Sequence, residues 1–405
     1  MKWVRNKVLL LLAALGVAAA YSLAFLTHAP NRLVSGAGIT LADMVSNLPA
    51  GSHPALSLLA VAGPALLIVA GIFMPPWRST HVLVGVAATA MLTSLMFLAA
   101  NHASLLALDA ADPATGLSSS IARTSFGGAF WVLAAIAWLA AGDAIGRLKL
   151  EPGPRLLASA AVIAPVVVCI ATGVLAPLSL LKEYASRRDV FDAALAQHVQ
   201  LVLASLLPSV LIGMPLGLAA ARSGRWMNAL RPLLFSTLNI IQTIPSIALF
   251  GLLMAPLALL AIQVPLLGQW GIKGVGMAPA VIALTLYSLL PVVRSTAAGL
   301  GQVPRAVVDA ARGVGLTNRQ IFWKVEVPLA LPIFISGLRV ATVQVIGLAV
   351  VAALIGAGGF GAIMFQGLLS GALDLVLLGT VPVVAMALVA DALLKAAALS
   401  LVHEP

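Results

Sequence analysis

The segment DAARGVGLTNRQIFWKVEVP, residues 309–328, is a polar interval in a chain of 405 residues that is 61% hydrophobic and only 9% charged. The apolar residues around it come in runs of eighteen or more, each long enough to cross roughly 30 Å of hydrocarbon as a helix. A mean hydropathy of +1.08 agrees with this reading. We therefore predict an all-α, polytopic membrane bundle in which residues 309–328 form a connecting loop.

The loop carries its own start and stop signals. Pro304 suits the first turn of a helix, so we predict a short helix from Arg305 to Gly313. Thr317 and Gln320 then match a capping box, which predicts the start of a second short helix. A sharp turn at Gly315 and Leu316 would join the two.

The small residues Ala310 and Ala311 would let another protein approach the first helix closely, while the charges around them keep it in water. This combination predicts a docking element. An ordinary connecting loop and a basic loop that binds anionic lipid are the alternatives, and Asp309 and the glycines count against the second.

We expect about ten spans. Residues 232–262 are too long for one straight helix and contain Pro245 and Pro256, so we expect a broken helix or a helix with a re-entrant piece there. The full set lies near residues 7–26, 56–74, 81–100, 127–146, 156–177, 198–221, 232–262, 276–297, 331–356 and 374–400.

The first run, residues 7–26, follows a basic head, which is also typical of a secretory signal peptide. Because the run continues to Leu26, we interpret it as a spanning helix. Cleavage is the alternative, and it would leave the topology of the remaining chain unchanged.

The basic residues predict the orientation. Ten spans with an internal N-terminus place fifteen Lys and Arg in inner segments and six in outer ones, so the positive-inside rule puts both termini and the loop in the cytoplasm. The inner residues are Lys2, Arg5, Lys7, Arg78, Arg147, Lys149, Arg155, Arg222, Arg225, Arg231, Arg294, Arg305, Arg312, Arg319 and Lys324, and the outer ones are Arg32, Arg123, Lys182, Arg187, Arg188 and Lys273.

A polar interval at residues 178–197 divides the chain. Its amphipathic pattern predicts a helix at the outer membrane surface with Leu and Phe facing lipid, and a contact surface for an outside partner is the alternative. We place an N-terminal extension of about five helices at residues 1–180, and a second set of about five at residues 195–405.

Composition excludes several classes. The net charge of +10 is dispersed between apolar runs, which argues against nucleic-acid binding, and the single Cys169 excludes an intrachain disulfide and a cysteine metal site. No Gly-Lys dipeptide occurs, so the chain has no P-loop and is not itself an ATPase. We expect no catalytic residue, metal or cofactor in this chain.

Uncharged polar residues at membrane depth mark a candidate translocation path: Gln242, Ser246 and Gln344. Interhelical hydrogen bonding is the alternative for them. The path or a gate would also include Pro245, Gly356, Gly358 and Gly359, although the three glycines would serve equally in a simple turn.

An ion-coupled secondary transporter would be expected to carry acidic residues in mid-membrane. Here Asp143, Arg339, Asp391 and Lys395 lie near predicted inner helix ends. This placement disfavours ion coupling. Gly213 and Gly217, four residues apart, predict a close contact between helices.

The loop resembles the cytoplasmic loop of ABC importer permeases, which reads E-A-A, three residues, Gly, nine residues, then I-x-L-P. The matching positions here are Asp309, Ala310, Ala311, Gly315 and, after nine residues, VEVP ending at Pro328. Asp replaces Glu, and Val replaces Ile and Leu. The resemblance implies a type I importer core whose coupling loop, within residues 301–330, docks on a separate ATPase subunit through Asp309, Ala310, Ala311, Arg312, Gly315 and Pro328.

Three further segments are similar to the osmoprotectant branch of these permeases, for glycine betaine, choline and proline betaine. They are QTIPSIALFGLL at 242–253, LYSLLPVVRST at 286–296 and LRVATVQVIGLAVVAALIGAGGFG at 338–361. The resemblance covers residues 195–400, and the first 180 residues look like the extension of a longer subset.

The resemblance also implies the partners and the place of work. These are ATPase subunits that bind ATP and Mg, a second permease subunit, a solute-binding protein outside, and the bacterial inner membrane. Scattered Trp and Tyr offer no aromatic cage for a quaternary ammonium, so we expect the binding protein to recognise the solute. A permease for an amino acid or a metal is the nearer alternative, and a secondary transporter the more distant one.

Overall fold

The computed structural model describes residues 4–31, 36–46, 54–109, 122–222, 225–269 and 271–400. The chain divides into two compact units, one ending at Ser186 and the other beginning at Arg187. Lys2 and Arg32, which enter the charge count above, lie outside the described residues.

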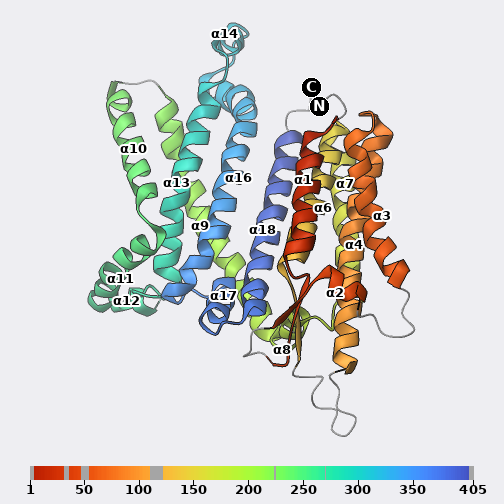
Figure 1. Ribbon diagram of the computed structural model, residues 1–405. Coiled ribbons are helices and arrows are strands. Elements are labelled where there is room, and N and C mark those ends of the chain that lie inside the picture. Colours follow the sequence, from red (N-terminus) through yellow and green to blue (C-terminus); the bar gives the residue numbers. More distant parts are fainter. Residues whose placement is uncertain are drawn as a thin grey trace. The chain divides into compact units, whose positions relative to one another are not determined.

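Unit 1 is a bundle of five longer helices with short elements at one end (Figure 1). The start of α1, the link between α3 and α4 and the link between α6 and α7 lie together at the other end. The longer helices are α1 (Lys7–Ser22), α3 (Pro54–Phe73), α4 (Arg78–Asp109), α6 (Gly128–Arg147) and α7 (Pro152–Ala171), and the short ones are α2 (Leu41–Ser46) and α8 (Ser179–Ser186).

A small antiparallel sheet, which the sequence did not predict, follows α1. Its strands are β1 (Leu26–Ala29), β2 (Ala37–Ile39) and β3 (Arg123–Phe126), with β1 in the centre. Leu26 pairs with Ile39 on one side and Phe126 on the other.

The expected helix over residues 7–26 is therefore wrong at its end, since α1 stops at Ser22. Phe25 and Leu26 are fully buried in the core of unit 1, so the apolar residues after Ser22 pack inside the protein instead of extending a helix.

Polar contacts hold the opposite end of unit 1 together. The Asn6 side chain caps α1 by accepting from the backbone N–H groups of Val8 and Leu9, and its Nδ2 donates to Asp143 Oδ2 over 2.9 Å. Arg147 donates to the same carboxylate over 2.7 Å. The start of α1 is thus fixed against the end of α6.

In the described part of unit 2, five helical segments are long and apolar enough to cross a membrane, and α10 and a projecting loop accompany them. Its long helices are α9 (Arg188–Ala221), α10 (Arg225–Thr243), α11 (Ser246–Gln263), α13 (Met277–Gly301), α16 (Val327–Val351) and α18 (Leu373–Ser400). Between them lie α12 (Pro265–Gln269), α14 (Arg305–Gly313), α15 (Asn318–Ile321), the π-helical turn η1 (Phe322–Glu326), the 3₁₀ turn η2 (Ala352–Ile355) and α17 (Phe360–Leu369).

Helix α13 forms the centre of unit 2, with 61% of its most apolar stretch buried. The predicted close contact is confirmed, because a Cβ on Gly213 would lie 2.7 Å from Val292 Cγ1 and one on Gly217 would lie 2.5 Å from Thr296 Cβ. Only glycine lets α9 approach α13 this closely.

The break predicted within residues 232–262 is also confirmed. Helix α10 ends at Thr243, and Pro245 is the N-cap of α11. Figure 1 shows α11 turning away at the end of unit 2 opposite to α14. Pro256 is accommodated inside α11.

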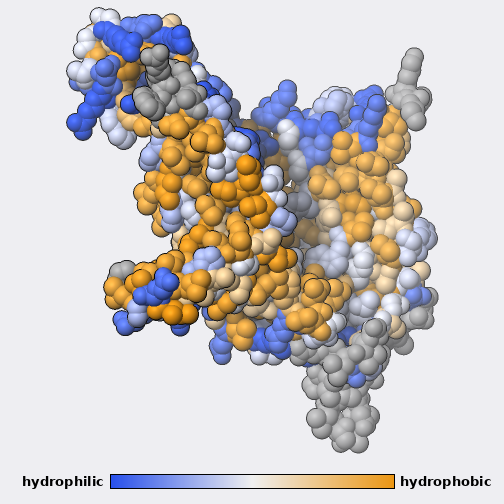
Figure 2. Space-filling view, turned by 90° about the vertical axis from the view of Figure 1, so that its left-hand side faces the viewer, coloured by the Kyte–Doolittle hydropathy of each residue, from blue (hydrophilic) through white to orange (hydrophobic). Residues whose placement is uncertain are grey.

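Eight described helices, rather than ten, are long and apolar enough to cross a membrane. The two expected spans that fall short are those at α1 and α3, which count only as shorter apolar helices within the described residues. In Figure 2, hydrophobic side chains cover much of the surface between the ends of the helices, and hydrophilic ones gather towards the ends.

Two further expectations need correction. The amphipathic helix over residues 178–197 is not one element, because α8 ends at Ser186, Arg187 has a non-helical conformation, and the remaining residues begin α9. In addition, Arg339 lies near the middle of α16 and forms an ion pair with Asp391 of α18. The sequence had suggested that both charges lie near helix ends. In the structure the charge of Arg339 lies mid-helix, and the opposite charge of Asp391 compensates it.

Candidate functional site

The predicted docking loop has the expected local structure. Helix α14 runs from Arg305 to Gly313 with Pro304 as its N-cap, and it projects beyond the neighbouring helix ends (Figure 1). It ends in a Schellman motif: the Leu316 N–H donates to Ala311 O and the Gly315 N–H to Arg312 O, over 3.1 and 2.9 Å. Gly315 has φ +87°, a left-handed conformation that glycine adopts without strain.

The predicted capping box is present. The Thr317 N–H donates to Gln320 Oε1 over 2.9 Å, and the Gln320 N–H donates to Thr317 Oγ1 over 3.4 Å. The second helix is not short, however. It continues without interruption from Asn318 to Ile355, through η1 and α16. The loop therefore connects directly to a membrane-spanning helix.

The π-helical turn η1 lies at the base of the loop and ends at Glu326, two residues before Pro328. The Val327 N–H donates to Phe322 O, which is the wider spacing of a π-helix. Such turns are often found at functional sites. The guanidinium of Arg222, which caps α9, lies 5.6 Å from the centre of the Phe322 ring. This cation–π contact links the base of the loop to α9.

The surface of the loop mixes apolar and charged side chains. Three apolar side chains of the loop are exposed: Val307 by 41%, Val314 by 79% and Trp323 by 61%. Packing within unit 2 therefore covers these side chains only in part. Asp309 and Arg312 form an exposed ion pair of 3.5 Å, and Ala311 is the buried residue of α14. An exposed apolar surface with a charged rim is suited to contact with another protein.

A second site is a cavity of about 420 Å³ between α10, α13 and α16. Gln242 and Gln344, both predicted for the path, line it, and so do Arg294, Ser295 and Gly337. None of the described residues that line it is aromatic. Its volume lies within the range for small-molecule sites.

Hydrogen bonds orient the polar side of this cavity. Gln242 Nε2 donates to Tyr287 O over 2.7 Å, Arg294 Nη2 donates to Asn239 Oδ1 over 2.9 Å, and the Tyr287 hydroxyl donates to Ile244 O. Each joins α13 to α10 or to the residues just after it.

The structure does not bring all predicted path residues to this cavity. Pro245 and Ser246 begin α11 and are not among its lining residues. Arg294 does line it, although its charge had suggested only an inner segment. A signal in the sequence was available. Arg294 lies one helical turn after Pro291 and one before Ala298, so the three share a helix face, and all three line the cavity.

The three remaining path residues, Gly356, Gly358 and Gly359, form a junction at the far end of α16 with φ between +75° and +82°. Gly356 caps η2, and Ile355 O accepts from the N–H of Gly276 over 2.7 Å. The other two glycines pack against α9, as a Cβ on Gly358 would lie 2.2 Å from Gln197 Oε1.

His198, next to Gln197, is fully buried beside this junction. Its Nε2 lies 3.1 Å from Ile346 O, and its ring centre lies 5.6 Å from that of Phe360. In the sequence alone neither Gln197 nor His198 stands out, since each resembles an ordinary helix position. No cluster of three or more metal-ligating side chains occurs in the part of the chain that the structure describes.

The membrane-length helices form a bundle with an open pocket, lined in part by polar side chains, and one of them carries a projecting helical loop. These features define a membrane transport subunit built to contact another protein. The comparisons make the class specific. The chain belongs to the permease subunits of ABC importers, in the osmoprotectant branch.

Two family models match in tandem. The model described as "ABC transporter permease YehY, N-terminal domain" matches residues 4–181, and "Binding-protein-dependent transport system inner membrane component" matches residues 213–401. The chain is therefore a long form of the permease, with an N-terminal transmembrane extension.

Curated relatives match the second half. The chain is 38% identical to the osmoprotectant import permease protein OsmW of Salmonella typhimurium over 198 residues, which is 49% of this chain and 85% of the relative. It is 34% identical over 195 residues to the glycine betaine/carnitine/choline permease protein OpuCB of Bacillus subtilis, 48% of this chain and 81% of the relative. The choline permease protein OpuBB of the same species is 35% identical over 201 residues, covering 50% and 83%.

Among solved structures, an inward-facing form of the MetNI methionine ABC transporter matches with a TM-score of 0.42 and 23% identity. The match covers 52% of this chain and 97% of the solved one.

Proposed function

We propose that this permease imports glycine betaine or a related quaternary ammonium osmoprotectant across the bacterial inner membrane. Separate ATPase subunits bind ATP and Mg and supply the energy, and a binding protein outside delivers the solute. The observation that carries the proposal is the docking loop, in which the Asp309 to Gly315 spacing coincides with a projecting helix and a glycine turn.

The loop's exposed surface supports an ATPase as its partner. Helix α14 places Asp309, Ala310 and Arg312 on an element whose residues are exposed apart from partly buried Val308 and buried Ala311. The apolar side chains of Val307 and Val314 lie on the same projecting segment, and that of Trp323 lies at its base. A cleft that receives this segment would bury them.

One chain has one such loop, so the proposed importer contains two permease subunits, identical or different. The charge distribution supports an orientation in which the loop and both termini are cytoplasmic. The cavity lined by Gln242, Arg294 and Gln344 would then lie along the solute path.

The proposed mechanism is alternating access. When ATP binding closes the ATPases, α14 moves with them, and the uninterrupted helix from Asn318 to Ile355 carries the displacement into unit 2. Hydrolysis then resets the bundle. The junction of Gly356, Gly358 and Gly359 is the proposed gate or hinge at the other end of that helix.

The solute assignment is supported by the relatives and by the cavity's walls. The similar proteins are named as permeases for glycine betaine, carnitine or choline. Because no described lining residue is aromatic, the cavity offers no cation–π cage, which favours recognition by a separate binding protein.

Reconstitution tests the proposal. Proteoliposomes that contain the permease, the ATPase and the binding protein should accumulate radiolabelled glycine betaine or choline with internal ATP alone, at a rate that an ionophore leaves nearly unchanged. Uptake that persists without the ATPase and collapses with an ionophore would restore the secondary transporter. ATP-dependent uptake of only amino acids or metals would keep the mechanism and reject the solute.

A further inference from the structure

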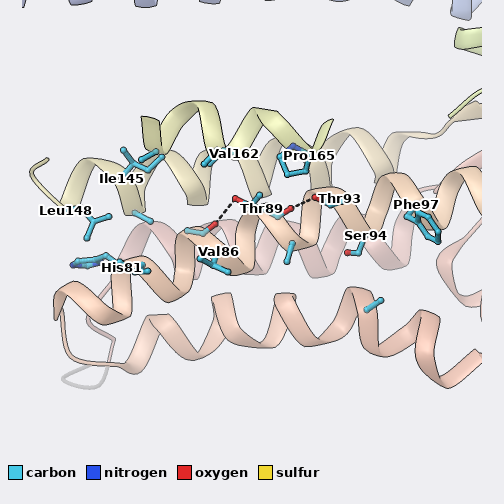
Figure 3. Close-up of a pocket in the computed structure, with 17 residues that line it drawn as sticks. His81, Val86, Thr89, Thr93, Ser94, Phe97, Ile145, Leu148, Val162 and Pro165 are labelled. Carbon is cyan, nitrogen blue, oxygen red and sulfur yellow. Dashed lines mark hydrogen bonds between the residues drawn. The ribbon is translucent and has the colours of Figure 1, made fainter. Parts of the chain in front are cut away.

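A long groove runs along the side of unit 1 between α4, α6 and α7 (Figure 3). Its volume is about 880 Å³. His81 and Leu148 lie at one end and Phe97 towards the other. Since His81 and Phe97 are both on α4, the groove follows that helix for about 24 Å at 1.5 Å per residue.

The walls of the groove are apolar. The hydroxyl groups along it are occupied by their own helix: Thr89 donates to Gly85 O over 2.9 Å, Thr93 to Thr89 O over 2.8 Å and Ser94 to Met91 O over 2.9 Å. A polar ligand would therefore find few partners along the groove. A hydrocarbon chain would leave no polar group unsatisfied.

Helix α7 leaves the groove open because it packs loosely within unit 1. Only 11% of its most apolar stretch is buried, against 44% for both α4 and α6. Ala158, Ala161 and Val162 line the groove from α7, and the two alanines are too small to fill it. In a membrane, lipid tails are the material available to occupy such a space.

The end of the groove at His81 and Leu148 is basic. Arg78 lies one helical turn before His81, Lys149 follows Leu148 directly, and Arg155 lies one turn before Ala158. All three basic residues are exposed.

Two neighbouring groups, Glu151 and Arg147, change the net charge at this end of the groove only a little. Glu151, in the link between α6 and α7, is exposed and contributes one negative charge at this end. Arg147 is already engaged by Asp143 and Asn6. The exposed charge of the groove's end is therefore positive.

We propose that this groove binds an anionic glycerophospholipid. One acyl chain lies between α4 and α7, and the phosphate contacts Arg78, Lys149 and Arg155. The groove is longer than one leaflet of the hydrocarbon core, about half of 30 Å, so a full acyl chain fits with its headgroup at the basic end. A lipid held there would replace the packing that α7 lacks.

Photo-crosslinking tests the site on the full chain in lipid nanodiscs. The probes are phosphatidylglycerol and phosphatidylcholine with the same diazirine-bearing acyl chain. Phosphatidylglycerol should label peptides from residues 86–97 and 158–165, and more strongly than phosphatidylcholine does. One basic residue near a membrane surface favours an anionic lipid about fivefold, so Lys149→Gln with Arg155→Gln should reduce this labelling about tenfold or more.

Matched variants separate this site from general effects. Lys7→Gln removes an exposed charge at the first residue of α1, a position that does not line the groove, and should leave labelling unchanged. Ala161→Trp should block labelling, whereas Ala160→Trp, at an exposed position that does not line the groove, should not.

Equal labelling by the two lipids would overturn the proposal, and so would labelling that survives Ala161→Trp. The proposal would also be overturned if neither lipid labelled the groove and the probes labelled other segments of the protein. The groove would then be covered by a helix of this chain or of a second copy.

Discussion

The backbone N–H of Gly359 donates to Oε1 of Gln197 over 3.0 Å, joining the turn after α16 to the first part of α9. The same oxygen would lie 2.2 Å from a Cβ on Gly358. Glycine is thus favoured at position 358 by its φ of +78° and by the space that the end of the Gln197 side chain occupies.

Gly358→Ala should therefore disrupt the junction. The left-handed conformation alone costs about 1–2 kcal/mol for a residue with a Cβ, and displacement of Gln197 adds to this. We expect a lower melting temperature for the purified chain and reduced solute uptake by the complete importer.

Gly371→Ala provides the matched control. Gly371 has φ +66° but no atom within 4 Å of the added Cβ, so this variant carries the conformational cost without the collision. Gln197→Ala combined with Gly358→Ala should recover part of the lost stability. Equal melting temperatures for the variants at 358 and 371 would show that Gln197 does not constrain the junction.

A substitution series at Gly315 tests the turn of the docking loop. No atom lies within 4 Å of a Cβ at this position, so the effect depends on the φ of +87° alone. Asn should be tolerated best, Ala less well, and Val least, because β-branched residues are most restricted there. The measurements are ATPase co-purification and ATP-driven uptake.

Gly313→Ala is the control in the same loop, because Gly313 ends α14 without a left-handed conformation and its Cβ meets nothing within 4 Å. It should leave both measurements unchanged. If Gly315→Val also retained normal co-purification and uptake, the loop would not be the coupling element.

The contact between α9 and α13 predicts a stability difference between two glycines. A Cβ on Gly217 would lie 2.8 Å from the backbone oxygen of Val293, which cannot easily move. Gly217→Ala should destabilise the protein by about 1–3 kcal/mol. Gly347→Ala on α16 meets no atom and should be neutral or stabilising by up to about 1 kcal/mol. Thermal unfolding in detergent measures both, and similar midpoints would contradict the contact.

Cysteine labelling tests the proposed orientation. In a Cys169→Ala background, Ser79→Cys and Gly153→Cys should be shielded from an impermeant thiol reagent in intact cells, and Ser186→Cys should react. All three positions are exposed in unit 1. Ser118 and Ser223, which lie outside the described residues, extend the series, with reaction expected at 118 only. The reverse pattern would invert the topology and remove the cytoplasmic docking loop.

His28 predicts a local pH dependence in the sheet of unit 1. Burial lowers the pKa of His28 below 6.5, and the charge of Lys182 lowers it further. Between the folded and unfolded pKa values, the unfolded state binds more protons, so folding stability falls as the pH drops through this window and levels off below it. The protection factors for hydrogen exchange of residues 26–29 and 37–39, corrected for the intrinsic pH dependence of exchange, should fall accordingly.

The two causes of the shift can be separated by substitution. His28→Gln should remove this dependence, and Lys182→Gln should narrow the window, because one of the two causes is then absent. An unchanged dependence in His28→Gln would assign the effect to another group.

Local features of the docking loop could be predicted from the sequence because their causes lie within a few residues. The fixed φ of Pro304 suits the start of a helix, and the left-handed turn at position 315 suits glycine. The side chains of Thr317 and Gln320 accept from each other's backbone N–H groups. The break before Pro245 follows from proline's missing N–H in the same way.

Features that depend on distant segments could not be predicted. Leu26 belongs to a strand because Ile39 and Phe126 are placed beside it, although its own neighbours resemble the end of a helix. Likewise, the pairing of Arg339 with Asp391, and the gathering of Gln242, Arg294 and Gln344 around one cavity, depend on how the helices pack.

The unbroken helix from Asn318 to Ile355 has a mechanical consequence. At 1.5 Å per residue, its 38 residues form a rod about 57 Å long, with the docking loop at one end and the glycine junction at the other. If the rod pivots at the junction, a tilt of about 3° sweeps its opposite tip through about 3 Å. A tilt this small would leave most side-chain packing near the junction undisturbed. It would still let the docking loop follow the closing motion of a partner.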